Sequence, residues 1–288
     1  VVAVEIQTWA KLWAAGSHTD IMWNVEGSGI FTCPCNVLDC SKVAMSGLTA
    51  DWEHRLGTAL DTIADLDHYS NLSKTVTKGF FLGDELLTSC GTPLANLTAV
   101  AQVVRDRFGP DVFIYTNEDG RAFDPPAGGV PGLCAASLRC AADGTRRDCC
   151  LSGPGGVPAL LDAISIDVYG GTLNQSGLPD QNCPDAAREA DCVFEYLEKM
   201  VYPRLNRKQN VWVVPGLYGV EADEVTDDLL VRKLDLYWER AVQDPRVIGF
   251  KPWHFNNDPP VNGSSASARW QNQYLLHSIH IASSLFIC

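Results

Sequence analysis

Basic residues are few in this chain. Its 288 residues include 22 Lys and Arg against 35 Asp and Glu, which gives a formal net charge of −13 and a pI of about 4.8. Nucleic acids and anionic lipid surfaces are bound by positively charged protein surfaces. The charge balance therefore argues against both as partners, whereas the 46% hydrophobic and 20% charged residues are typical of a globular protein.

Long apolar runs and a leader segment are also missing. No run reaches the roughly 20 residues that a membrane-spanning helix needs. The apolar stretch 274–288 is interrupted by two His and two Ser, so we expect a terminal helix that packs on the domain. The chain begins at Val1 without a signal peptide, as the mature or truncated form of a longer protein would.

Motifs for metal or nucleotide binding are absent as well. There is no Cys-x2-Cys pair matched by a second one and no His-x3-His, and the spacings of Cys33-Pro34-Cys35 and Cys149-Cys150 are poor for zinc. No expected strand is followed by a G-x-G-x-x-G motif or a P-loop. We therefore expect no metal and no other cofactor. A metal-dependent hydrolase that uses acids as ligands is an alternative, weakened by the absence of clustered His.

Cysteine, by contrast, is abundant. The chain has 11 Cys and four Asn-x-Ser/Thr glycosylation acceptors, at Asn71, Asn96, Asn174 and Asn262. Together these features indicate an oxidising, secretory compartment and a secreted or extracellular glycoprotein with disulfide bonds. Because eleven is odd, at least one thiol is free or pairs with another extracellular chain.

Strand-like and helix-like segments alternate along the chain. The expected strands are 20–27, 79–85, 112–116, 163–169, 211–218 and 247–255. The expected helices are 51–66, 93–108, 191–205, 227–243 and 268–286. Residues 1–15 fit a strand or a helix, and the apolar stripe favours a helix. Alternation of this kind predicts a parallel sheet.

The loops divide into two kinds. Those after the expected strands are long, Gly-rich and Cys-bearing, whereas most of those after helices are short. An α/β barrel places its binding loops at the carboxyl ends of its strands. We therefore predict one (β/α)8 TIM-type barrel domain over 1–288, with disulfide-stapled loops on its C-terminal face. Six firm strands and one doubtful strand fall short of eight, so either the first strands precede Val1 or the barrel is incomplete. An open doubly wound sheet is the alternative.

The most informative stretch is 79–87, an apolar run that ends in two adjacent acids, Asp84 and Glu85. Acids are costly near a core but tolerated at the mouth of a barrel. Neighbouring residues of a strand point to opposite faces, so the two acids share a pocket only if the strand ends there. The other strand ends deliver further polar and aromatic residues: Glu26, Asn117, Glu118, Asp119, Asp167, Tyr169, Tyr218, Glu221, Trp253 and His254.

Such a rim suits the cleavage of glycosidic bonds. The reaction needs a protonated carboxylic acid for the leaving oxygen and a second group that supports an oxocarbenium-like transition state. Low-dielectric walls and a neighbouring anion both favour the protonated form of an acid, so an adjacent pair can hold the proton. Aromatic rings offer flat apolar surfaces on which sugar rings stack.

At these residues the sequence resembles (β/α)8-barrel glycoside hydrolases. Phe81-Leu82-Gly83-Asp84-Glu85-Leu86 is similar to the Gly-Asp-Glu motif of substrate-assisted hexosaminidases, minus one Gly and a His. The resemblance implies that Glu85 is the general acid and that Asp84 orients an acetamido group. Asp167, Tyr169 and Trp253 resemble sixth- and eighth-strand residues of chitinase-like barrels. The Asp-x-x-Asp-x-Asp-x-Glu run of chitinases is absent, and Asn117-Glu118 matches the Asn-Glu pair of retaining barrels one strand late.

Our interpretation is a secreted glycoside hydrolase that acts on a polysaccharide or glycoconjugate, with N-acetylhexosamine as a candidate sugar. Glu85 is the candidate acid, and Asp84, Asp167 and Tyr169 are candidates for positioning the substrate or stabilising an intermediate. The further candidates for contacting the carbohydrate are Trp253, Tyr218, Asn117 and Glu118. The alternative is a non-catalytic barrel that serves as a carbohydrate-binding or extracellular structural glycoprotein.

Overall fold

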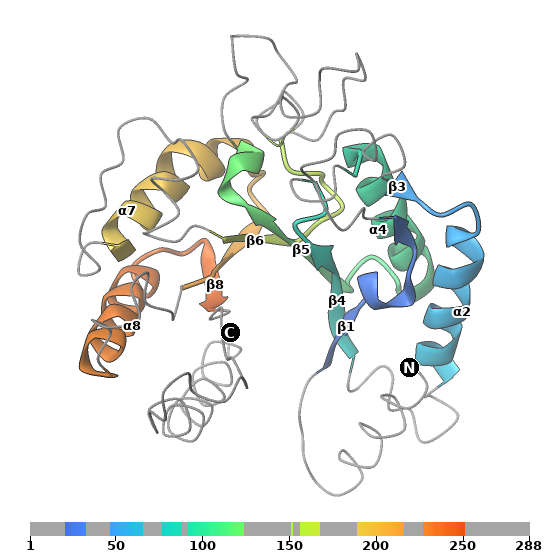
Figure 1. The fold of residues 1–288 in the computed structure, drawn as a ribbon, viewed down its shortest axis with the longest axis horizontal. Coiled ribbons are helices and arrows are strands. Elements are labelled where there is room, and N and C mark those ends of the chain that lie inside the picture. The colour runs from blue at the N-terminus through green and yellow to red at the C-terminus, as the bar shows by residue number, and fades with distance from the viewer. Residues whose placement is uncertain are drawn as a thin grey trace, which may run out of the picture. The chain divides into compact units, whose positions relative to one another are not determined.

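Six strands form one sheet in the order in which they occur along the chain (Figure 1). The computed structural model describes residues 21–32, 47–65, 77–87, 92–123, 151, 156–167, 189–215 and 227–250. The strands are β1 (Ile21–Asn24), β4 (Thr77–Asp84), β5 (Phe113–Asp119), β6 (Ala163–Asp167), β7 (Asn210–Val213) and β8 (Val247–Phe250). The β1–β4, β4–β5 and β7–β8 pairs are parallel. The expected parallel arrangement is therefore confirmed for these pairs.

The sheet is not closed within the described ranges, because β1 and β8 are the two ends of the strand order. A separate antiparallel pair, β2 (Phe31–Thr32) with β3 (Gly47–Leu48), was not expected from the sequence. Its two strands are only two residues long, which is too short for a period to be recognised. The segments 1–15 and 268–286 lie outside the described residues. The expected barrel lies partly outside them.

Along the described part of the chain, four α-helices alternate with the strands: α2 (Trp52–Ala64), α4 (Leu94–Phe108), α7 (Glu189–Tyr196) and α8 (Asp227–Ala241). The expected helix 191–205 is α-helical only in its first half. It continues as a π-helix, η8 (Leu197–Val201), and a 3-10 turn, η9 (Tyr202–Arg204). Pro203, in that last turn, lacks the N–H that an α-helix needs. Two further 3-10 turns follow β1 and β5: η1 (Glu26–Ser28) and η4 (Gly120–Phe123).

The described residues fall into two compact units, and the first holds β1 to β5 with α2 and α4. Its core follows the helical spacing of apolar residues, since Leu97, Val100 and Val104 of α4 are fully buried. The ring of Phe80 in β4 lies 4.8 Å from the ring of Phe108 at the end of α4. Helix α4 therefore covers the face of the sheet on which Phe80 lies.

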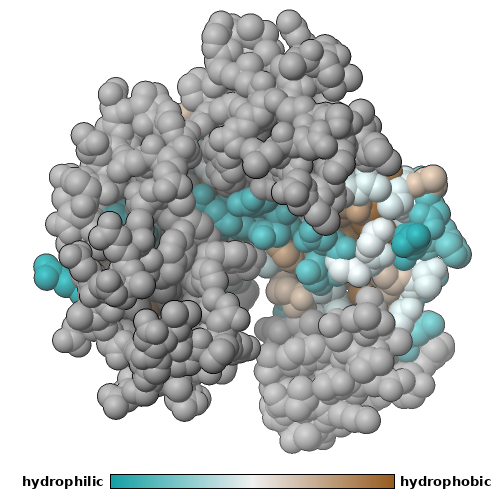
Figure 2. Space-filling model, viewed as in Figure 1, coloured by the Kyte–Doolittle hydropathy of each residue, from teal (hydrophilic) through white to brown (hydrophobic). Residues whose placement is uncertain are grey.

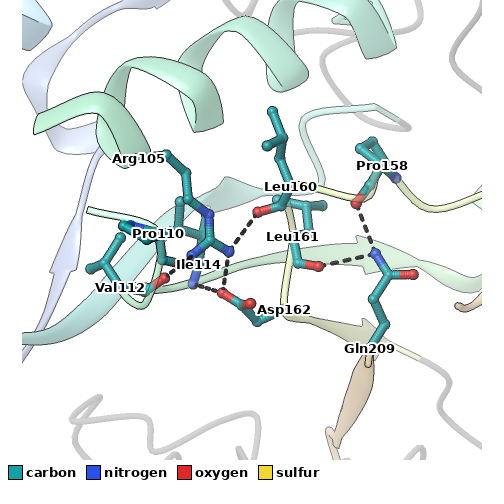
Figure 3. A network of polar contacts seen from close by, with 9 residues as sticks. All are labelled: Arg105, Pro110, Val112, Ile114, Pro158, Leu160, Leu161, Asp162 and Gln209. Carbon is teal, nitrogen blue, oxygen red and sulfur yellow. Dashed lines mark hydrogen bonds and ion pairs between the residues drawn. The ribbon is translucent and has the colours of Figure 1, made fainter. Parts of the chain in front are cut away.

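A polar network fixes the amino ends of β5 and β6 to α4 within this unit (Figure 3). Arg105 Nη2 donates to Asp162 Oδ2 at 2.7 Å, and the same oxygen accepts the main-chain N–H of Ile114 at 2.7 Å. Arg105 also donates to three main-chain carbonyls, those of Pro110, Val112 and Leu160. One guanidinium thus supplies hydrogen bonds to main-chain carbonyls of both the turn after α4 and the loop before β6.

Gln209 completes the network through its side-chain amide. Its Nε2 donates to the carbonyls of Pro158 at 2.7 Å and Leu161 at 3.0 Å, and the residue is only 2% exposed. Buried carbonyls without partners cost roughly 1–3 kcal/mol each. By donating to these carbonyls, Gln209 avoids that cost in a loop that has no secondary structure of its own.

The second unit packs α7 on α8. Tyr237 of α8 donates from its hydroxyl to Glu189 Oε1 at 2.8 Å, and both residues are buried. The rings of Phe194 and Tyr237 lie 6.5 Å apart, and the Arg240 guanidinium lies 5.6 Å from the Phe194 ring. Cys192, also in α7, is disulfide-bonded.

The surface of the described part is mixed in character. On the face drawn in Figure 2, hydrophilic areas alternate with smaller hydrophobic ones. Among the described residues, Val242 is the large hydrophobic side chain that is exposed, at 56%. None of the described helices combines the length and the apolar character that crossing a membrane requires.

Gly79 of β4 gives a stability prediction. A Cβ at this position would lie 2.2 Å from the main-chain oxygen of Phe113 and 2.9 Å from Met22 Cε. Because a strand backbone cannot move away without breaking its pairing, Gly79→Ala is expected to lower the free energy of unfolding by about 2 kcal/mol. Gly57→Ala in α2 is the control: nothing lies within 4 Å of its Cβ position, so it should be neutral or stabilising. Urea denaturation of the two variants checks both; equal midpoints would contradict the prediction.

Candidate functional site

Three polar side chains meet where β1, β4 and β5 end. Asn117 Nδ2 in β5 donates to Asp84 Oδ1 in β4 at 2.7 Å. The main-chain N–H of Asp84 donates to Glu26 Oε2, two residues after β1, at 3.1 Å. The carboxyl ends of parallel strands share one edge of a sheet, which is how residues so distant in sequence come together.

A bulge in β4 decides which acid faces Asn117. Phe81 pairs with Tyr115 and Asp84 pairs with Asn117, so three steps along β4 match two steps along β5. An extra residue of this kind turns the following side chain to the other face of the strand. Regular pairing would have placed Gly83 opposite Asn117; the bulge places Asp84 there.

The site lies on the sheet face that α4 does not cover. Phe80 contacts α4, so the neighbouring Phe81 belongs to the opposite face. There its ring stacks on that of Tyr115, with centroids 4.9 Å apart. Asn117 follows Tyr115 by two residues and shares its face. In a closed α/β barrel, this face would be the inner one.

Glu85 occupies a strained turn directly after β4. Its φ is 45°, and within the described residues it is the one residue other than Gly with a positive φ. Such a backbone costs roughly 1–3 kcal/mol and persists only when the surroundings enforce it. The main-chain N–H of Glu85 donates to the carbonyl oxygen of Asn117 at 2.9 Å. Glu85 and Asp84 are both partly exposed.

Residues on either side of Asn117 fix the rest of this turn. Thr116 Oγ1 donates to the carbonyl of Gly83 at 3.0 Å. The fully buried carboxylate of Glu118 accepts the main-chain N–H of Leu87 with both oxygens, at 3.1 and 3.3 Å. Three consecutive residues of β5 therefore hold the turn that carries Glu85.

Not all of the candidate residues fall in this cluster. Asp167 is the last residue of β6, 9% exposed, and belongs to the second unit. Several candidates lie outside the described residues: Tyr169, Tyr218, Glu221, Trp253 and His254, and the glycosylation acceptors Asn71, Asn174 and Asn262. Asn96 lies in the first turn of α4 and is half-buried. Within the described ranges, no group of three or more His, Cys, Asp and Glu residues is placed to hold a metal ion.

The sequence interpretation did not single out Tyr115. Burial, with a smaller contribution from the negative charge of Asp84, raises the pKa of Tyr115 to about 12. The phenol therefore stays protonated beside the acid cluster over the physiological range. The signal was present as an aromatic residue two positions before Asn117, which places both on one face of a strand.

Alkaline pH should consequently destabilise the protein through Tyr115. The unfolded side chain titrates near 10.0 and the folded one near 12, so the stabilising contribution is complete below pH 10 and is lost as pH rises to about 12. At about 1.4 kcal/mol per pKa unit, the rise of the Tyr115 pKa from 10.0 to about 12 corresponds to a loss of roughly 3 kcal/mol. Urea denaturation across this range should show a shallower decline for Tyr115→Phe than for the wild type. Burial also raises the pKa of Tyr202, and Tyr202→Phe shows how much of the decline it causes; parallel curves for wild type and Tyr115→Phe would contradict the assignment.

Comparisons with known proteins give a weak likeness of fold. No protein-family model matches the chain, and no curated protein is significantly similar to it. The structure is similar to Ruminococcus gnavus β-glucuronidase, with a TM-score of 0.38 and 12% identity over 72% of this chain and 30% of that one. The same enzyme in complex with uronic isofagomine gives a TM-score of 0.34 and 12% identity over 79% and 34%. The chain thus spans about a third of the length of the enzyme it resembles. Similarity at this level does not assign an activity.

Proposed function

We propose that the chain is a glycoside hydrolase that cleaves glycosidic bonds in a polysaccharide or glycoconjugate, with Glu85 as the general acid. The observation that carries the proposal is the strained backbone of Glu85, which β5 enforces at the carboxyl end of a parallel strand. Strain that the surroundings enforce at an acidic residue is typical of active sites. A structural acid at a loop would need no such arrangement.

The chemistry follows from two neighbouring acids with different surroundings. Asp84 is bound by the Asn117 amide, and its carboxylate is therefore fixed in place. Glu85, which like Asp84 is partly exposed, lies on the strained turn that follows the strand. In this proposal Glu85 donates a proton to the leaving oxygen, while the negative charge of Asp84 favours the positive charge that develops on the sugar.

The remaining assignments extend the same proposal. Asp167 and Tyr169 position the substrate, and Trp253 stacks on a sugar ring, with Tyr218 as a further contact. A closed (β/α)8 barrel would bring these strand ends to one rim. The cysteine content and the sequons support a secreted glycoprotein, and mass spectrometry of the protein from a secreting host tests glycan occupancy at the four acceptors.

A substrate panel tests the function. The full chain is incubated with para-nitrophenyl hexosides, hexuronides and N-acetylhexosaminides, and with oligosaccharides of the same sugars. Turnover of at least one class that is lost in Glu85→Gln supports the proposal. Binding of a sugar without turnover, unchanged by this substitution, would instead support the non-catalytic carbohydrate-binding barrel. Activity that a chelator removes would indicate a metal-dependent hydrolase.

A further inference from the structure

We propose that Asn117 is a positioning residue that fixes both acids of the site, Asp84 through its side chain and Glu85 through its main chain. The catalytic consequence rests on the proposed function, but the positioning itself does not. This role differs from the direct substrate contact that the sequence suggested for Asn117. The proposal follows from two hydrogen bonds and from the burial of the residue.

Asn117 contacts the two acids with different groups, its side-chain amide and its main-chain carbonyl, and its burial leaves the amide little freedom. Asn117 is 1% exposed, and its Nδ2 already donates to Asp84 Oδ1 at 2.7 Å. Its carbonyl oxygen accepts the N–H of Glu85 at 2.9 Å. Thr116 and Glu118 contact the turn on either side, at Gly83 and Leu87, and neither of these bonds reaches a side chain of the pair.

The side-chain bond matters because Asp84 is partly exposed. A carboxylate at the end of a strand has several rotamers of similar energy unless a partner selects one. The bulge directs Asp84 to the face of Phe81 and Tyr115, and the amide of Asn117 selects one rotamer there. A displacement of about 1 Å in a reacting group can lower a rate by up to about 10²-fold. Removal of the amide should therefore affect catalysis although the fold is kept.

The first test needs no activity, because Tyr115 reports on the position of the Asp84 charge. That charge raises the pKa of Tyr115 after burial has done so. If Asn117 holds Asp84 in place, Asn117→Ala should lower the Tyr115 titration midpoint toward the value found in Asp84→Asn. The midpoint is measured from tyrosinate absorbance as the difference between each protein and its Tyr115→Phe counterpart.

A matched control is available on the surface of α4. Gln102 Nε2 donates to Asp106 Oδ1 at 2.7 Å, which is the same amide-to-carboxylate bond in an exposed setting. Gln102→Ala should leave the Tyr115 titration and the kinetics unchanged. Thermal melts identify any Asn117 variant that fails to fold, and Asn117→Leu, which is uncharged and similar in size, is then used in place of Asn117→Ala.

The second test uses turnover of the best substrate from the panel. Asn117→Ala should lower kcat by about 10–10²-fold with KM changed less than about twofold, because placement of the acids matters most in the transition state. Asn117→Asp should move the acidic limb of the pH–rate profile to higher pH, because adjacent carboxylates resist ionising together. A residue that only supports the fold would lower the amount of active protein and leave the profile where it was.

The outcomes separate the two proposals. A lowered Tyr115 midpoint in Asn117→Ala without hydrolysis by the wild type would sustain the positioning role and remove the glycosidase. Hydrolysis by the wild type with an unchanged Tyr115 midpoint and unchanged kinetics in Asn117→Ala would remove the positioning role. A lowered Tyr115 midpoint in Asn117→Ala together with unchanged kinetics would contradict the catalytic consequence of the positioning role.

Discussion

The Glu85→Gln variant is expected to hydrolyse an oligosaccharide substrate about 10²–10⁴-fold more slowly than the wild type, because glutamine cannot donate a proton to the leaving oxygen. The loss should be much smaller for a para-nitrophenyl glycoside, since nitrophenolate leaves without protonation. The ratio of the two losses is therefore the measurement that identifies an acid. The basic limb of the pH–rate profile should also disappear in the variant.

Glu53→Gln provides the control for this prediction. Glu53 is an exposed acid in the first turn of α2, in the same unit of the structure. Its replacement should leave both substrates unaffected. Equal losses on both substrates in Glu85→Gln would indicate damage to the turn at the end of β4, and no loss on either would remove Glu85 from the reaction.

Arg105→Ala is expected to lower the free energy of unfolding by about 3 kcal/mol, the largest stability effect that we expect. The guanidinium is 12% exposed and Asp162 is 34% exposed, so the pair is shielded from water on most sides. Its removal leaves a carboxylate with a single remaining partner, the N–H of Ile114, and three carbonyls without a donor. Arg105→Lys, which keeps the charge without the planar fork, should lose less than Arg105→Ala.

Arg107→Ala is the matched control, two residues further along α4. Arg107 Nη2 lies 2.8 Å from Asp61 Oδ1, but the two side chains are 45% and 64% exposed. Exposed ion pairs contribute about 0–1 kcal/mol. Urea denaturation of the three variants gives the comparison. A loss for Arg105→Ala no greater than that for Arg107→Ala would mean that water replaces the guanidinium at little cost.

The sequence predicts the frame of the molecule well where one period governs a long segment. The buried face of α4 can be predicted because Leu97, Val100 and Val104 repeat at the helical interval. The strands can be predicted as apolar runs between turn residues, and their parallel pairing follows from their alternation with helices. The shared edge of such a sheet predicts that Asp84 and Asn117 lie near each other, but not that they pair directly.

The sequence fails where pairing departs from its period. Strict alternation places Glu85, not Asp84, on the face of Phe81, and the bulge that reverses this includes Gly83, whose presence alone does not fix where the pairing shifts. The role of Glu118 was also hidden: it was a candidate for contacting the substrate, and its carboxylate is bound to the Leu87 N–H. That bond depends on the shape of a turn, which residue types alone do not specify.

The Arg105 network lies at the edge of the sheet where β5 and β6 begin, whereas the acids lie where β1, β4 and β5 end. The polar contacts that stabilise the fold and the polar groups of the candidate site therefore lie at opposite ends of β5. Substitutions at the chemical end can then accumulate without eroding the contacts that anchor the frame. A randomised library restricted to the partly exposed Glu26, Asp84 and Glu85, which spares the buried residues of β5, should retain a high proportion of folded members.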